Sequence, residues 1–172
     1  MRRTKITFTP DLPKFGMAAF DADTLDLFKK RVYDMAGTCP KGLKVFLNGE
    51  QLKVKGFLEY CRLFVSADVA LVHSKVDRWE VAVTSTQDGA FEQISFVNAI
   101  ATSKGGQHVN AVTDQVTKGV VAHCVKKFKS TTVKPQVVKN HLWVFVNCSI
   151  VNPRFDSQTK VPPIPFARWA RA

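Results

Sequence analysis

The stretch of residues 137–151 constrains the fold more than any other part of the chain, because it has the strongest β-strand pattern. It is rich in Val, Ile, Trp and Phe, which are residue types favoured in strands. Apolar side chains fall on both faces from Leu142 to Val146, which is typical of a central strand covered on both sides. The pattern predicts a sheet built around this strand, which Asn152-Pro153 ends because proline has no N–H for the ladder.

Other strands and two turns are predicted upstream of this stretch. Alternating or β-favouring side chains predict strands at residues 4–9, 43–47, 51–54, 78–86 and 91–100. Asn48-Gly49 is typical of a tight turn and joins two of the short strands. Asp88-Gly89 is a second such turn, so residues 78–100 are expected to form a strong hairpin.

Helical spacing of apolar residues predicts three helices, at residues 21–36, 57–65 and 108–128. Either Asp21 or Asp23 is placed to cap the first helix. The third helix is expected to turn one stripe inward, formed by Val109, Val112, Val116, Val120 and Cys124. Because the pattern weakens from residue 66 to 76, we place a domain boundary there. The order of elements predicts an α+β fold in two layers.

The chain has a large excess of positive charge, with a formal net charge of +11 from 25 Lys+Arg and 14 Asp+Glu. Such an excess favours a polyanionic partner, nucleic acid first and an acidic membrane second. A basic surface that binds no partner would explain the same net charge. No apolar run approaches the roughly 20 residues that would cross a bilayer.

Lysines cluster where the third predicted helix ends. This cluster consists of Lys126, Lys127, Lys129 and Lys134, with Phe128 among them. Clustered lysines suit contacts to a phosphate backbone, and one aromatic ring can stack on a base. Lysines at a helix C-terminus also oppose the helix dipole, so the same charges are explained without a ligand.

Other candidate sites are weaker. Lys104-Gly105-Gly106 precedes a helix, where it can cradle a phosphate or only permit a tight turn. The cysteines and histidines show no metal-binding spacing, so we predict reduced thiols and no zinc site. After the central strand, Gln158, Thr159 and Lys160 offer an amide, a hydroxyl and an ammonium group, which can bind an anion. Composition alone favours a solvated loop, because connecting loops are normally polar.

Several long motifs resemble the eukaryotic type II DNA topoisomerases, in the same order along the chain. They are Ile-Thr-Phe-Thr-Pro-Asp-Leu-Pro-Lys-Phe (6–15), Arg-Val-Tyr-Asp-Met-Ala-Gly (31–37), Lys-Val-Phe-Leu-Asn-Gly (44–49), Arg-Trp-Glu-Val (78–81), Ile-Ser-Phe-Val-Asn-Ala-Ile-Ala-Thr-Ser-Lys-Gly-Gly (94–106), Lys-Asn-His-Leu-Trp-Val-Phe-Val-Asn (139–147) and Asn-Pro-Arg-Phe-Asp-Ser-Gln-Thr-Lys (152–160). The resemblance covers residues 4–160, which is nearly the whole chain.

The resemblance implies a domain organisation. Residues 1–72 are expected to be the C-terminal remnant of a GHKL-type ATPase domain, and residues 73–160 an incomplete transducer domain. Residues 161–172 are a divergent proline-rich tail. The transducer is expected to be a two-layer, ribosomal-protein-like βαβ fold with a left-handed crossover, against the usual right-handed rule.

The resemblance also implies binding residues. Gln158, Thr159 and Lys160 match the loop that reaches ATP, with Lys160 at the terminal phosphate, and Lys126, Lys127 and Lys129 match a loop that contacts DNA. The complete enzyme is expected to use ATP and Mg²⁺, to act on double-stranded DNA as a homodimer, and to work in the nucleus without a membrane.

Some family features have no counterpart here: the magnesium-binding asparagine, the glutamate general base, the ATP lid and the cleavage tyrosine. We therefore expect no catalytic residue and no metal ligand in this sequence, and no ATP hydrolysis or strand passage by this chain alone. Two alternatives stay open. One is a non-catalytic DNA-binding module, and the other is an inactive gene remnant that does not fold.

Overall fold

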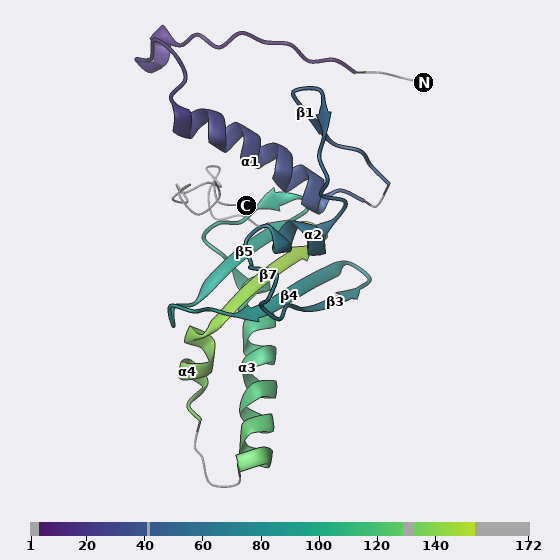
Figure 1. The fold of residues 1–172 in the computed structure, drawn as a ribbon, viewed down its shortest axis with the longest axis vertical. Coiled ribbons are helices and arrows are strands. Elements are labelled where there is room, and N and C mark those ends of the chain that lie inside the picture. Colours follow the sequence, from purple (N-terminus) through teal and green to yellow (C-terminus); the bar gives the residue numbers. More distant parts are fainter. Residues whose placement is uncertain (1–3, 41, 129–132, 154–172) are drawn as a thin grey trace.

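A five-stranded mixed sheet lies at the centre of the structure, a computed structural model that describes residues 4–40, 42–128 and 133–153 (Figure 1). In spatial order its strands are β3 (Val72–Val76), β4 (Trp79–Ser85), β7 (Leu142–Cys148), β5 (Glu92–Val97) and β6 (Ile100–Ala101). β7 is antiparallel to β4 and parallel to β5, so the last described strand lies between two earlier ones. The prediction of a central strand here is confirmed.

β7 is shorter than the predicted strand at both ends. Its fully buried centre consists of Val144, Phe145 and Val146, so both faces are covered as predicted. Upstream, the chain forms a short helix, α4 (Pro135–Asn140), because the fixed φ of Pro135 favours the first turn of a helix. Downstream, the backbone N–H of Ile150 donates to the side chain of Asn98 and not to a neighbouring strand, which ends the ladder.

The predicted hairpin at residues 78–100 is wrong, because β7 separates β4 from β5. β4 instead forms a hairpin with β3, and β5 forms one with β6. The second of these turns at Asn98 and Ala99, which both have positive φ, 52° and 62°. The loop after β4 passes the start of β7 on its way to β5. There the N–H of Thr86 donates to the carbonyl of His141 at 2.9 Å. The Asp88-Gly89 turn therefore belongs to a longer connection.

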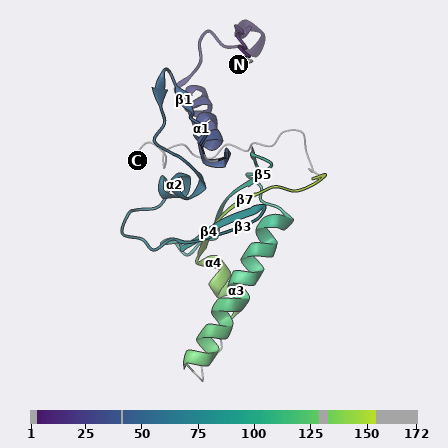
Figure 2. The same ribbon diagram turned by 90° about the vertical axis from the view of Figure 1, so that its right-hand side faces the viewer.

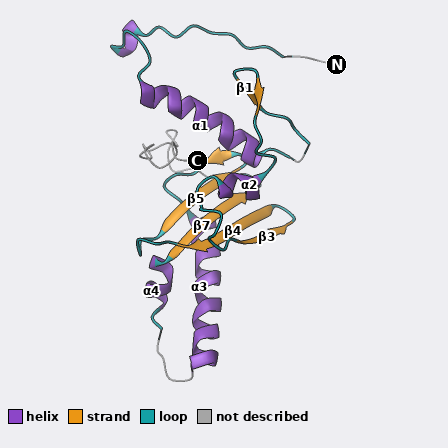
Figure 3. Ribbon diagram, in the orientation of Figure 1, coloured by secondary structure: helices purple, strands orange, loops and turns teal. Residues whose placement is uncertain are grey.

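Helices cover both faces of the sheet (Figures 2 and 3). On one face lie α3 (Gln107–Phe128) and α4, which connect the parallel strands β5 and β7. On the other face lies α2 (Phe57–Arg62), with α1 (Ala22–Thr38) packed on it. The α+β class is confirmed, and the sheet with α3 and α4 forms the two-layer part. The hand of the crossover stays a prediction.

Each face has its own apolar cluster. The face toward α2 buries Phe57, Tyr60, Cys61, Val65, Ala82, Phe96 and Phe145. The face toward α3 and α4 buries Val97, Val109, Val138, Leu142, Val144, Val146 and Cys148. Successive residues of β7 alternate between the two clusters, as the two-residue period of a strand requires.

The first part of the chain forms small elements around α1. The Asp21 side chain caps α1 by accepting the N–H of Thr24 at 2.8 Å, so the choice between the two aspartates falls on Asp21. β1 (Phe46–Leu47) and β2 (Glu50–Gln51) form the predicted hairpin, with positive φ at Asn48 and Gly49. A 3₁₀ turn, η1 (Pro13–Phe15), precedes α1. α2 ends earlier than predicted, because i→i+3 hydrogen bonds tighten the chain at Leu63 and Phe64.

The strand predicted at residues 4–9 is wrong. These residues pair with no described strand, and Ile6 and Phe8 are exposed. Alternation alone does not make a strand, because its N–H and C=O groups need a neighbouring strand. The predicted domain boundary between residues 72 and 73 falls inside β3 and stays a prediction. None of the described helices combines the length and apolar character that crossing a bilayer requires.

Candidate nucleic-acid interface

α3 carries the lysines predicted to bind DNA and projects beyond the sheet (Figures 1 and 2). Its 22 residues give a length of about 33 Å at 1.5 Å per residue. The buried residues of α3 are Val109, Thr113 and Thr117, all in its first half. After Thr117, the side chains are exposed or half-buried. The first half therefore anchors the helix on the sheet and the second half extends it away.

The predicted inward stripe of α3 is confirmed in part, since Val109 is buried and Val112 and Val116 pack against the same cluster. The buried face also includes Thr113 and Thr117, whereas Val120 of the predicted stripe is 38% exposed. Threonine was counted as polar, but the Thr113 hydroxyl donates to the carbonyl of Val109 at 2.8 Å within the helix. Its polar atom is thus satisfied locally, and the methyl group is free to pack.

The free end of α3 presents Lys126 and Lys127 to solvent in its last turn. The ammonium of Lys127 lies 5.6 Å from the centre of the Phe128 ring, a cation–π contact on a ring that is 56% exposed. Neither lysine forms an ion pair with any described residue. Both ammonium groups are therefore available to an anion. Lys129 lies outside the described residues.

The sequence around this end is almost free of negative charge. From residue 101 to 153 the only acidic residue is Asp114. The lysines of the same range are Lys104, Lys118, Lys126, Lys127, Lys129, Lys134 and Lys139. α4 lies beside α3 and carries Lys139, whose ammonium lies 5.6 Å from the centre of the Phe91 ring. The excess of positive charge thus follows both helices of the βαβ connection.

The three residues predicted to contact ATP, Gln158, Thr159 and Lys160, lie outside the described residues. The segment that leads toward them is described to Pro153. Asn98 holds it, because its amide donates to the Ile150 carbonyl at 3.0 Å and its oxygen accepts the Ile150 N–H at 2.9 Å.

Sequence reasoning missed the role of Asn98, which was read as part of a strand. An available signal was the dipeptide Asn98-Ala99, since asparagine tolerates the positive φ that a tight turn needs.

The remaining candidates are the Lys104-Gly105-Gly106 loop, a metal site and the four cysteines. Gly105 and Gly106 both have positive φ, 73° and 149°, which supports the tight-turn interpretation of Lys104-Gly105-Gly106. Within the described ranges, no three His, Cys, Asp or Glu side chains come together where they would hold a metal ion. All four cysteines are free thiols. Burial raises the pKa of Cys148 to about 11 and raises that of Cys61 further, so both buried thiols stay protonated.

Comparison with known proteins assigns the family. The sequence model of the DNA gyrase B family matches residues 43–162. DNA topoisomerase 2 of Arabidopsis thaliana is 52% identical over 166 residues, which cover 91% of this chain and 11% of the relative. DNA topoisomerase 2-beta of Gallus gallus is also 52% identical, over 91% of this chain and 10% of the relative. The chain therefore spans about a tenth of the length of the curated relatives it matches.

Solved structures agree with this assignment. The ATPase region of Saccharomyces cerevisiae topoisomerase II matches with a TM-score of 0.76 and 42% identity, over 88% of this chain and 38% of that chain. The ATPase and transducer domains of DNA topoisomerase II from Balamuthia mandrillaris match with a TM-score of 0.73 and 43% identity, over 80% and 35% of the two chains. The chain therefore belongs to the DNA gyrase B family, and within it the sequence is similar to the eukaryotic type II DNA topoisomerases.

Proposed function

We propose that this chain is a part of an ATP-dependent type II DNA topoisomerase that couples ATP binding and hydrolysis to DNA strand passage. The observation that carries the DNA side of the proposal is the exposed, acid-poor end of α3, with Lys126 and Lys127 unpaired among the described residues. Phosphate contacts by such lysines are independent of sequence and sensitive to salt. Lys129, which lies outside the described residues, follows them in the sequence and is proposed to take part. Duplex DNA is the proposed partner.

On the ATP side, Gln158, Thr159 and Lys160 are proposed to contact ATP held elsewhere in the complete enzyme. A lysine suits the terminal phosphate because its ammonium is a compact charge on a long stem. Loss of that contact on hydrolysis would release a ligand-held switch. The complete enzyme is proposed to be a homodimer in the nucleus, with residues 1–72 in its ATPase domain and residues 73–160 in its transducer domain.

Among the described residues, no three His, Cys, Asp or Glu side chains come together as a metal site. No step of ATP hydrolysis is therefore assigned to them. The chain alone is proposed to be inactive as an ATPase and as a topoisomerase. A purified sample that hydrolyses ATP in proportion to its concentration would contradict this, provided that a heat-denatured sample does not.

The DNA contact is tested by salt-dependent binding of the chain to duplex DNA. Replacing Lys126, Lys127 and Lys129 by Ala should weaken binding and lower the salt slope by about three, since each lost phosphate contact removes about 0.9. The matched control replaces three exposed lysines of the β1–β2 region by Ala, namely Lys44, Lys53 and Lys55. It changes the net charge equally and should retain most of the binding. Equal losses in both variants would show that only overall charge matters.

The coupling role is tested in a chimera. The matching segment of the Arabidopsis thaliana relative would be replaced by this chain, and ATP-dependent relaxation of supercoiled DNA would be measured. The chimera should relax DNA, and Lys160→Ala should abolish most of this activity, whereas Lys53→Ala should not. An inactive chimera that folds and dimerises would overturn the coupling role.

A non-catalytic DNA-binding module is the second candidate, favoured by the same exposed lysine end. It predicts binding of DNA to the chain without any effect of Lys160→Ala in the chimera. Thermal unfolding, followed by near-UV circular dichroism, distinguishes a folded DNA-binding module from an unfolded gene remnant. A cooperative transition raised by duplex DNA would support a folded binding surface, and a featureless melt would support the remnant.

A further inference from the structure

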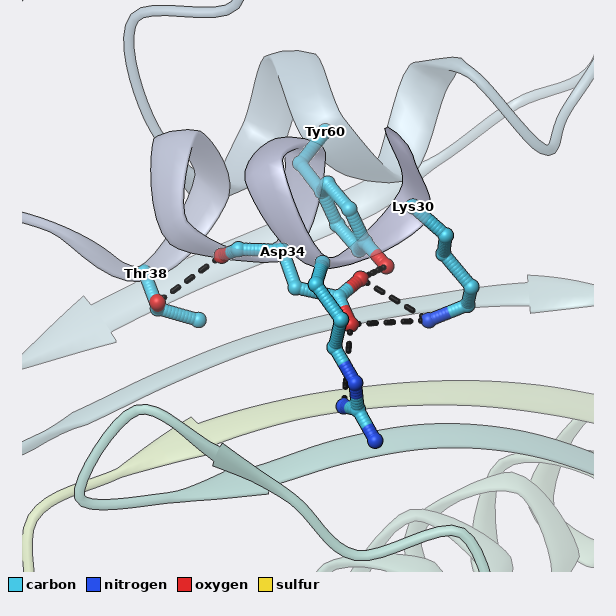
Figure 4. Close-up of polar contacts among 5 residues, drawn as sticks. Lys30, Asp34, Thr38 and Tyr60 are labelled. Atoms are coloured by element: carbon cyan, nitrogen blue, oxygen red, sulfur yellow. Dashed lines mark hydrogen bonds and ion pairs between the residues drawn. The ribbon is translucent and has the colours of Figure 1, made fainter. Parts of the chain in front are cut away.

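A buried polar cluster joins α1 to α2, with the Asp34 carboxylate at its centre (Figure 4). Asp34 is 3% exposed and Lys30 is 8% exposed. The Tyr60 hydroxyl donates to Asp34 Oδ1 at 2.6 Å. Lys30 Nζ donates to both carboxylate oxygens, at 2.8 and 2.9 Å, and Arg31 approaches Oδ2 at 3.4 Å. Both oxygens of the buried Asp34 carboxylate thus accept hydrogen bonds.

Tyr60 carries the contact onward to the sheet. Its ring is fully buried and packs edge-on against Phe96 of β5, with centroids 5.6 Å apart. The same ring lies 5.1 Å from that of Phe64. Burial raises the pKa of Tyr60 well above its usual value, and the Asp34 charge adds to this shift, so the hydroxyl keeps its proton. Tyr60 therefore contacts α1 through its hydroxyl and packs on the sheet through its ring.

The geometry requires a close approach of the two helices. A Cβ at Gly37 of α1 would lie 2.6 Å from Tyr60 Cγ and 2.7 Å from Tyr60 Cβ. Only glycine leaves room for the tyrosine at this point. One turn of helix separates Gly37 from Asp34, so the same stretch of α1 supplies the space for the ring and the acceptor for its hydroxyl.

A polar contact in this place has a different consequence from an apolar one. A buried ion pair is often no more stabilising than apolar side chains of the same size, because both charges lose their hydration. Such a contact does depend on the relative position of its partners, since removing or displacing one of them leaves an uncompensated charge. The contact between Tyr60 and Asp34 therefore favours one arrangement of α1 over alternatives that bury as much surface.

We propose that the Asp34–Tyr60 hydrogen bond is the joint that makes α1 and the five-stranded sheet open as one unit. Among the described elements α1 packs mainly on α2, so without this bond α1 would be held less firmly and would open before the sheet does. The proposal concerns contacts within the chain and holds whether or not the protein acts with ATP. It also means that the predicted boundary at residues 72 and 73 does not separate two independently opening parts.

The test is native-state hydrogen–deuterium exchange of the full chain, read by mass spectrometry at low denaturant. Peptides from α1 and from β7 report the two sides of the joint. In the unaltered chain, both should exchange through the same opening. In Tyr60→Phe, which keeps the ring and loses the hydroxyl, α1 should exchange at least about tenfold faster relative to β7, as the loss of a hydrogen bond to a charged group implies.

The matched control is Thr113→Val, which removes a buried hydroxyl on the opposite face of the sheet. It should leave the ratio of exchange between α1 and β7 unchanged. Asp34→Asn is a second variant, which also leaves the buried Lys30 ammonium without its carboxylate, so it should accelerate α1 at least as much as Tyr60→Phe does. Equal acceleration of α1 and β7 in both variants, or separate opening of α1 in the unaltered chain, would overturn the proposal.

Discussion

On one face of the sheet, Phe96 and Phe145 meet the aromatic side chains of α2, whereas on the other face Val144 and Val146 meet valines of α3 and α4. α2 has only 6 residues and α3 has 22. The short helix contributes Phe57, Tyr60 and Cys61 as buried residues, while the long helix buries only its first half. A helix of 6 residues has almost no stability of its own, so packing must hold it. The size of the buried side chains, more than helix length, decides how firmly each face is covered.

The largest expected effect compares neighbouring residues of β7 that face opposite ways. Phe145→Ala should lower the free energy of unfolding by about 3–5 kcal/mol, and Val144→Ala by about 2 kcal/mol, because the phenyl ring leaves the larger cavity. Urea unfolding followed by circular dichroism measures both. If Val144→Ala cost as much as Phe145→Ala, the aromatic face would not be the stronger one.

Two helical glycines should respond to alanine with opposite signs. Gly37→Ala on α1 collides with Tyr60 and should cost about 1–3 kcal/mol. A Cβ at Gly119 on α3 would meet no atom of the described residues within 4 Å beyond its own stretch of helix, so Gly119→Ala should gain about 0.5–1 kcal/mol from the better helix propensity. Midpoints of guanidinium unfolding give the comparison. A gain at both positions would mean that α1 and α2 separate easily.

Thr117 distinguishes packing from hydrogen bonding on the α3 face. Its hydroxyl is buried without a hydrogen-bond partner among the described residues. Thr117→Val should therefore raise the free energy of unfolding by about 1 kcal/mol. Thr113→Val serves as the comparison, because the Thr113 hydroxyl already donates to Val109 and its loss should bring no gain. Loss of stability in Thr117→Val would indicate that this hydroxyl has a partner after all.

A smaller effect concerns His108 at the start of α3, whose ring nitrogen lies 2.9 Å from the Thr102 hydroxyl. Burial lowers the pKa of His108 below its ordinary value of 6.5. The unfolded chain therefore binds the proton more readily, and stability is lost as the pH falls below about 6.5. His108→Gln should show a smaller fall in melting temperature between about pH 7.5 and about pH 5.5 than the unaltered chain. An equal fall would assign the pH dependence to other groups.

Local patterns predicted the individual elements better than their pairing. The helix from residue 107 to 128 and the centre of β7 were predictable because apolar spacing and residue type act over a few neighbours. The 78–100 hairpin was mispredicted because Asp88-Gly89 has the local features of a hairpin turn. The strand that separates β4 from β5 begins only at Leu142, so no local signal identifies it.

The candidate sites divide in the same way. The lysines of α3 were predictable, since charge clusters are visible in the sequence itself. The Asp34–Tyr60 contact was not, because it joins residues 26 positions apart and leaves no periodic pattern. Its buried lysine and aspartate instead resemble an ordinary exposed pair at i and i+4 on a helix.

The insertion of β7 between β4 and β5 has a consequence for synthesis of the chain. While the ribosome is still adding residues before Leu142, the five-stranded sheet can exist only as the separate β3–β4 and β5–β6 hairpins, each with an open inner edge. Such edges invite pairing with other chains, and a contact made so late in the sequence delays their closure. The two inner edges are covered only once residue 148 has emerged, so the nascent chain is open to aggregation from the completion of β4 until then.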